Sequence, residues 1–171
     1  CMTLKVFNTL SRKKEEFKTI EDGQVRMYVC GPTVYDKAHV GHAMSALVFD
    51  IIRRYLEYRG YSVRHVMNYT DVDDKIINRA NKLGMDPFDL ARSYIQQYAE
   101  HLLALNVLPA SYNPRATDEI ENIIKFVEDL IAKGYAYEAG GDVYFRVNKM
   151  DDYGKLSHRK LDDMRAGSRI E

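Results

Sequence analysis

The sequence predicts an α/β fold in which a parallel sheet is flanked by helices. Residues 25–29 alternate apolar and polar side chains, which is the pattern of a strand with one buried face. Residues 39–59 repeat apolar side chains at the three- and four-residue spacing of a helix, and residues 61–69 form a second strand-like stretch. A strand, a helix and a second strand of one sheet imply a parallel, right-handed crossover.

The ends of these elements carry their own signals. The first strand is expected to end near Cys30, because Pro32 interrupts regular structure. Gly60 is suited to end the helix, since glycine tolerates the left-handed conformation found there. Two rows of apolar side chains run along this helix: Leu47, Ile51 and Tyr55, then Val48, Ile52 and Leu56.

Further helices and a hairpin are predicted downstream. Helices are expected over about 73–83 and from Pro87 to about residue 105, with the proline at the first helical position. Residues 106–115 contain two prolines and are predicted to be a connector. Thr117 is predicted to cap a helix that runs to Lys133.

Three other stretches complete the prediction. Residues 135–137 and 143–147 are expected to pair as a β-hairpin that turns at Gly140-Gly141. The charged residues 13–16 are predicted to be a solvated face or a turn. Residues 149–171 are charged, and no closing element is recognised in them.

Composition excludes several classes of function. At 171 residues the chain has the size of about one domain, with 25 basic and 25 acidic residues and no formal net charge. No overall basic field indicates nucleic-acid binding, which leaves only a local patch open. Two cysteines are too few for a disulfide scaffold, and no apolar run resembles a membrane span or a signal peptide. We therefore expect a cytoplasmic, reduced protein with no membrane partner.

The strongest functional signal lies between the first strand and the following helix. His39-Val40-Gly41-His42 begins that helix, where free backbone N–H groups and the helix dipole favour a phosphate group. Two imidazoles placed there can donate hydrogen bonds to charge that develops on phosphate oxygens. Gly41 has no side chain, so a nucleobase can lie against its backbone. The alternative is that both histidines only cap the helix, and the four-residue pattern by itself favours that alternative.

Cys30 lies at the carboxyl end of the first strand, the edge at which open parallel sheets bind ligands. A thiolate there can ligate a metal or act as a nucleophile, whereas a free cysteine is more often a small buried apolar residue. One cysteine cannot complete a tetrahedral zinc site. The histidines away from the motif show no ligand spacing, and His65 is predicted to pack inside the second strand.

The segment Thr70–Lys75 closes the second strand at the same edge. Its carboxylates can bind an amino group or a magnesium ion, or Asp71 or Asp73 can cap the next helix, and the two interpretations carry equal weight. Thr70 is the better pocket candidate, because it ends the strand. No phosphate loop of the Walker type and no glycine-rich dinucleotide fingerprint is present.

Five segments together resemble the cysteinyl-tRNA synthetases, which are class I aminoacyl-tRNA synthetases. The matching segments are residues 4–10, 27–36, 39–42, 70–77 and 113–117. The resemblance implies ATP-dependent activation of L-cysteine to cysteinyl-adenylate, with Mg²⁺ accompanying ATP, and transfer of the cysteine to tRNA(Cys). It also implies the first half of a Rossmann-type nucleotide-binding domain over residues 1–117, and the beginning of an α+β connective insertion over residues 118–171.

The resemblance assigns roles to particular residues. His39 and His42 match the catalytic signature, and the ATP site would comprise Pro32, Thr33, His39, Gly41 and His42. Thr33 and Thr70 match the cysteine pocket, and Cys30 matches the first ligand of a catalytic Zn²⁺. Direct coordination of the substrate thiol would reject serine, since zinc prefers sulfur to a hydroxyl.

The resemblance is incomplete at the carboxyl end. The remaining zinc ligands, the Lys-Met-Ser-Lys-Ser type loop and the anticodon-binding region of the family would lie beyond Glu171. We therefore expect these 171 residues alone to be inactive and to bind zinc weakly, and we expect a monomer.

Two other functions compete with this interpretation. The related cysteine ligase of mycothiol biosynthesis joins cysteine to an amino sugar, but tends to have proline where this chain has Val34 after Thr33. A non-catalytic nucleotide-binding module would bind ATP without exchange activity.

Overall fold

The computed structural model describes residues 3–159. They form two compact units. We call residues 19–121 the sheet unit, and the residues up to 18 together with those from 122 onward the hairpin unit. The predicted absence of a closing element over 160–171 lies outside the described residues. Within residues 3–159, no helix combines the length and the apolar character that crossing a membrane requires.

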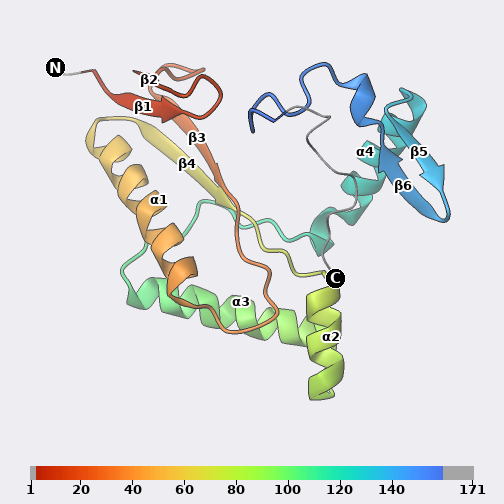
Figure 1. Cartoon of the computed structure of the whole chain (residues 1–171). Helices are drawn as coiled ribbons and strands as arrows, with labels where there is room; N and C mark the ends of the chain where they lie inside the picture. Colours follow the sequence, from red (N-terminus) through yellow and green to blue (C-terminus); the bar gives the residue numbers. More distant parts are fainter. Residues whose placement is uncertain (1–2, 160–171) are drawn as a thin grey trace. The chain divides into compact units, whose positions relative to one another are not determined.

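The sheet unit is built on the predicted parallel crossover. Strand β3 (Gln24–Val29) is joined by helix α1 (Val40–Tyr58) to strand β4 (Ser62–Met67), and Figure 1 shows α1 running beside the two strands. The strands are parallel and in register from Gln24 opposite Ser62 to Val29 opposite Met67. The predicted strand, helix and strand are thus confirmed, with ends within a few residues of those expected.

Residues 106–116 are more than the connector that the sequence predicted. They lie parallel to β4, with bridges between Val66 and Tyr112 and between Tyr69 and Arg115. The amide of Met67 donates to the carbonyl of Tyr112 over 3.1 Å, and that of Tyr69 donates to Pro114 over 2.8 Å. The segment therefore covers the free edge of β4. Its two prolines lack N–H groups, so the ladder is interrupted and no regular strand forms.

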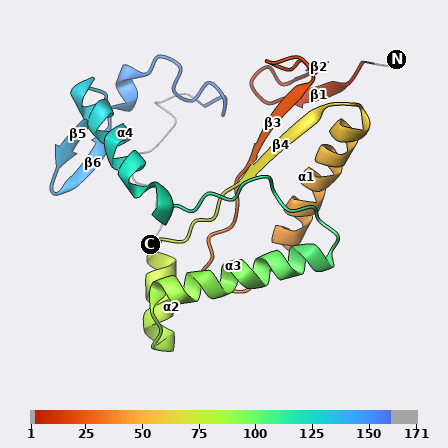
Figure 2. The same cartoon turned by 180° about the vertical axis from the view of Figure 1, so that it is seen from behind.

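Two helices link β4 to this segment. Helix α2 (Asp74–Leu83) starts at Asp73, whose carboxylate accepts from the amide of Lys75, and ends at Gly84 in the left-handed conformation (φ 64°). Helix α3 (Pro87–Ala104) starts at Asp86, whose carboxylate accepts from two amides of the first turn. Figure 2 shows α2 at one end of α3.

The core of the sheet unit gathers side chains from β4, α2, α3 and the loop before α1. Its buried members are Val34, Met67, Tyr69, Ile76, Ala80, Leu90, Ala91 and Tyr98. Val34 is 2% exposed although it lies in a loop. The loop that carries the predicted ligand residues is therefore anchored in the core.

The hairpin unit contains two antiparallel hairpins. Strands β1 (Lys5–Asn8) and β2 (Lys13–Glu16) form the first, and β5 (Ala136–Ala139) and β6 (Asp142–Phe145) form the second, as predicted through Gly140-Gly141. The chain reaches β5 through a 3-10 turn, η1 (Thr117–Glu119), and helix α4 (Ile120–Ala132), and a second such turn, η2 (Val147–Lys149), follows β6. Residues 13–16 are solvated as expected, but they form a strand and not a turn.

Candidate functional site

The loop after β3 and the end of β4 continue the parallel pairing beyond the two strands. The amide of Val34 donates to the carbonyl of Thr70, and the amide of Thr70 donates to the carbonyl of Pro32, each over 3.2 Å. This pairing places Thr33 directly opposite Thr70. The two threonines that the resemblance assigns to one pocket therefore lie side by side at the carboxyl edge of the strands.

Gly31 and Asn68 bring the two chains into close contact. A Cβ atom at Gly31 would lie 1.6 Å from the carbonyl oxygen of Asn68, so only glycine fits there. The amide of Gly31 donates to Oδ1 of Asn68 over 2.9 Å, and Nδ2 of Asn68 lies 3.4 Å from the hydroxyl of Thr70. Asn68, which the sequence analysis missed, thus connects the residue after Cys30 to the predicted pocket.

Cys30 is an exposed free thiol at the end of β3. It is therefore not the small buried residue that the alternative interpretation required. Its Sγ atom lies 3.7 Å from the carbonyl oxygen of Gly31. Among residues 3–159, no three His, Cys, Asp or Glu side chains gather closely enough to hold a metal ion. The described residues offer one thiolate ligand to a metal, and that ligand alone does not make a site.

His39 and His42 cap the first turn of α1. Nδ1 of His39 accepts the amide of Gly41 over 3.1 Å, and Nδ1 of His42 accepts the amide of His39 over 3.2 Å. This is a reciprocal capping box made by two imidazoles. The ring centroids are 3.9 Å apart.

The capping bonds also determine which ring nitrogen carries the proton. A nitrogen that accepts an N–H group cannot be protonated, so the neutral rings of His39 and His42 carry their protons on Nε2. Burial, and then the neighbouring His39, lower the pKa of His42. Capping therefore leaves the Nε2–H groups to donate to a ligand at the helix N-terminus, where the dipole favours an anion.

Helix α2 supports the loop from the other side. Arg79 lies 3.6 Å from the carboxylate of Asp36, and the ammonium group of Lys75 lies 5.6 Å from the ring centre of Tyr35. Burial, followed by the nearby Tyr69, raises the pKa of Tyr98 to about 12. Tyr98 and His42 line the same small cavity, and the hydroxyl of Tyr98 is protonated at neutral pH.

The acidic stretch after Thr70 has two separate roles. Asp73 caps α2, as one of the two interpretations held. Asp71 is buried and accepts both the amide of Thr117 over 3.0 Å and its hydroxyl over 2.5 Å. The prediction that Thr117 caps a helix is therefore wrong, because its hydroxyl bonds Asp71 and the helix begins with the turn η1. Asp71 instead connects the end of β4 to Thr117, which directly follows residues 106–116, the third parallel segment of the sheet unit.

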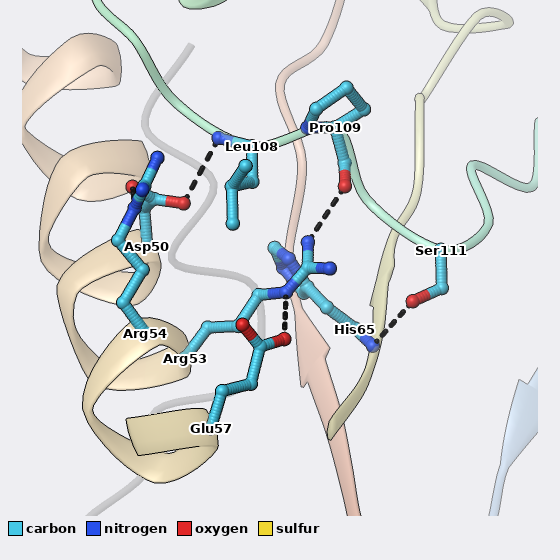
Figure 3. A network of polar contacts seen from close by, with 8 residues as sticks. All are labelled: Asp50, Arg53, Arg54, Glu57, His65, Leu108, Pro109 and Ser111. Carbon is cyan, nitrogen blue, oxygen red and sulfur yellow. Dashed lines mark hydrogen bonds and ion pairs between the residues drawn. The ribbon is translucent and has the colours of Figure 1, made fainter. Parts of the chain in front are cut away.

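A polar network holds α1 against residues 106–109 (Figure 3). Buried Asp50 accepts from Nε of Arg54 over 2.7 Å and from the amide of Leu108 over 3.0 Å. Arg54 also donates to the carbonyl of Asn106, and Arg53 donates to that of Pro109, each over 2.7 Å. We call these contacts the Asp50 network. It fixes the helix whose first turn carries the two histidines.

Comparison with known proteins then identifies the family. The family described as tRNA synthetases class I (C), catalytic domain, matches residues 16–171. The chain belongs to this class I (C) synthetase family. The resemblance noted in the sequence is thereby confirmed.

Relatives of this class I (C) chain include proteins named cysteine–tRNA ligase. That of Pyrococcus horikoshii is 57% identical over 170 residues, which is 99% of this chain and 36% of the relative. That of Dehalococcoides mccartyi is 56% identical over 168 residues, 98% of this chain and 37% of the relative. The ligase of Staphylococcus aureus is 52% identical over 166 residues, 97% of this chain and 36% of the relative. The chain thus spans little more than a third of the length of these relatives.

Solved structures agree with the α/β, Rossmann-type fold class. One match is a LeuRS from Agrobacterium radiobacter, solved in a ternary complex with tRNA and LeuAMS. Its TM-score is 0.61 at 24% identity, and the match covers 69% of this chain and 16% of that one. A methionyl-tRNA synthetase of Mycobacterium tuberculosis, in complex with methionyl-adenylate, matches with a TM-score of 0.59 at 26% identity, covering 66% of this chain and 23% of that one.

Two polar residues of this class I (C) domain, Asn68 and Asp50, were missed by the sequence analysis, and so was the partner of Asp71. The only feature of the sequence that points to Asn68 is its position at the end of a predicted strand. Asp50 stands among apolar positions of a helix, and a lone carboxylate on such a face suggests a buried contact. Asp71 bonds a residue 46 positions away, and nothing in the sequence pairs the two.

Proposed function

We propose that the protein containing this chain activates L-cysteine with ATP to form cysteinyl-adenylate and then transfers the cysteine to tRNA(Cys). The observation that carries this proposal is the capping box of His39 and His42 at the N-terminus of α1, which leaves both Nε2 atoms for a ligand. Thr33, which pairs with Thr70, lines one small cavity with His42. Its support from comparison is the 57% identity to a cysteine–tRNA ligase.

In this proposal the two histidines act on the α-phosphate of ATP. The carboxylate of cysteine attacks that phosphorus atom and pyrophosphate leaves, with Mg²⁺ accompanying the nucleotide. Nε2–H donors that are already in place stabilise the charge that develops on the phosphate oxygens. Gly41 lets the nucleotide approach the backbone, and Pro32 and Thr33 form the adjoining part of the ATP site.

The amino-acid pocket would lie between Thr33 and Thr70. Asn68 would keep the two sides of this pocket together through its bonds to Gly31 and Thr70. The exposed thiol of Cys30 suits one ligand of a Zn²⁺ ion whose other ligands come from outside these residues. Such an ion would supply selectivity for a thiol over a hydroxyl.

The test separates helix capping from catalysis. In the complete protein, His39→Asn keeps a good N-cap residue and His42→Gln keeps the partner that a capping box requires, while both remove the imidazole. We expect each variant to retain its unfolding midpoint and to lose about a hundredfold or more of cysteine-dependent ATP–pyrophosphate exchange. The matched control is His158→Asn, which removes an imidazole from the hairpin unit. Unchanged exchange in both variants would show that the histidines only cap the helix.

The exchange assay and a second assay of transfer to the acceptor together distinguish the competing functions. Exchange followed by charging of tRNA(Cys) supports the synthetase, whereas exchange with transfer only to an amino sugar supports the mycothiol-type ligase. ATP binding without any exchange supports a non-catalytic module. Residues 1–171 by themselves are expected to show no exchange, since the relatives are nearly three times as long.

A further inference from the structure

The sheet unit contains a cavity that the proposed function does not use. It has a volume of about 290 Å³ and lies between β3, β4, α1, α3 and residues 107–113. Its walls are mainly apolar, and include Val29, Ala46, Phe49, Met67, Leu102 and Val107. None of the residues proposed for ATP, cysteine or zinc lines it. Engineered apolar cavities of about half this volume bind a benzene ring, so size alone permits a small ligand.

Among the polar residues that line this cavity, which include Asn113 and Glu100, His65 has a buried side chain without a hydrogen-bond partner in the described part of the chain. The residue is 7% exposed, and neither ring nitrogen has a hydrogen-bond partner among the described residues. Its main chain is fixed, because its amide donates to the hydroxyl of Ser111 over 3.0 Å and its carbonyl accepts the amide of Ser111 over 2.7 Å. Figure 3 shows its side chain extending from β4 toward Arg53 of α1. A buried imidazole with both nitrogens unpaired is uncommon and calls for a partner.

The surroundings define the chemistry of that partner. Burial, and then the charge of Arg53, lower the pKa of His65, so the ring is neutral and has one donor and one acceptor. A hydroxyl group can both donate and accept, so it can bond the ring in either tautomer. Arg53 is already bonded to Glu57 and Pro109, and an exposed Glu100 stands at the rim, so nothing favours an anionic ligand.

We propose that this cavity binds a small uncharged phenol, with the ring among the apolar walls and the hydroxyl bonded to His65. Such a ligand contacts the sheet, α1 and α3 together. By binding only the folded state it stabilises the sheet unit in proportion to its concentration. The site is separate from the candidate active site, so binding does not require ATP or cysteine.

The test compares two aromatic probes of similar size. Para-cresol and toluene differ by one hydroxyl group, and each is titrated into the protein while the His65 ring nitrogens are followed by NMR. Saturable shifts with para-cresol, bound about threefold to tenfold more tightly than toluene, support the proposal, since one hydrogen bond contributes that much. Equal affinity of the two probes, or no saturable shift up to the solubility limit, overturns it and leaves the cavity to solvent.

Two variants locate the binding. Ala46→Leu places a larger side chain in the cavity wall and should abolish the binding of both probes. His65→Phe keeps an aromatic ring without nitrogens, so it should bind both probes equally well. Retained para-cresol binding in Ala46→Leu would place the ligand elsewhere and would contradict the proposal. Should a variant fail to fold, the comparison of the two probes on the unaltered protein still decides.

Discussion

Gly31 is the residue at which the site depends most directly on the absence of a side chain. A methyl group there would meet the backbone carbonyl of Asn68 at 1.6 Å, and backbone cannot rotate away as a side chain can. We expect Gly31→Ala to lower the free energy of unfolding by on the order of 3 kcal/mol, or to prevent folding, because the two parallel segments must separate. Urea unfolding measures this loss.

Gly41→Ala is the matched comparison for that experiment. Its added methyl would contact only the ring of His39, at 3.0 Å, and alanine favours a helix over glycine by up to about 1 kcal/mol. The fold should therefore survive while the His39 ring shifts. A Gly31→Ala protein as stable as the Gly41→Ala protein would show that the close contact is relieved without cost.

We expect two histidines to make the stability of the sheet unit depend on pH. The pKa values of His42 and His65 are lowered from 6.5, for both chiefly by burial. The unfolded chain then binds more protons than the folded chain just below pH 6.5, so the free energy of unfolding falls as the pH falls through that range. Urea unfolding at about pH 7.5 and about pH 5.5 should show this loss, and it should be smaller in His65→Phe. An equal loss in that variant would exclude His65 as a cause.

Residue positions were predictable where they depend on neighbours in the sequence. Cys30 lies at a strand end and His39 and His42 lie at a helix start, as expected. The bonds of Asp71 to Thr117 and of Asp50 to Leu108 span 46 and 58 residues, and they depend on how the elements pack. Local capping rules predicted the wrong partner for Thr117 because a buried carboxylate competes for the same hydroxyl.

At the scale of elements, the Asp50 network decides how α1 lies against residues 106–109. Asp50→Ala would leave the amide of Leu108 and the guanidinium of Arg54 without their carboxylate. We expect it to lower the free energy of unfolding by about 2 kcal/mol, the cost of unpaired polar groups at a partly buried site. Glu57→Ala, which breaks an ion pair on the same helix, should cost less than about 1 kcal/mol. Similar losses in the two variants would contradict a special role for Asp50.

Elements with clear end signals were predicted well, and elements without them were not. Asp73, Gly84 and the pair Asp86-Pro87 mark helix ends by local bonds and backbone preference, and the structure follows them. The third parallel segment was not predicted, because its two prolines are typical of a connector and not of a strand. Strand β2 was not predicted, because all four of its side chains are charged and exposed. Its sequence therefore lacks the alternation of apolar and polar residues that indicates a strand.

On the scale of the whole molecule, the two units differ in how much core they possess. Of the buried hydrophobic residues in the described part of the chain, Ala136 is the one that belongs to the hairpin unit. Helix α4 buries none of its residues and exposes Ile123, Ile124 and Phe126. Burial of apolar surface is the main favourable term in folding, so the sheet unit should hold most of the stability of this chain.

Hydrogen exchange followed by mass spectrometry tests this difference within one molecule. The amides of Met67 and Tyr69 are bonded to a neighbouring parallel segment beside the core, and they should open only with the whole sheet unit. The amides of β5 and β6 belong to an isolated two-stranded hairpin with little apolar support, so they should exchange at least about a hundredfold faster. Both segments experience the same solution, which makes each the control for the other. Equal protection would mean that the hairpin unit is stabilised by contacts other than burial of its own side chains.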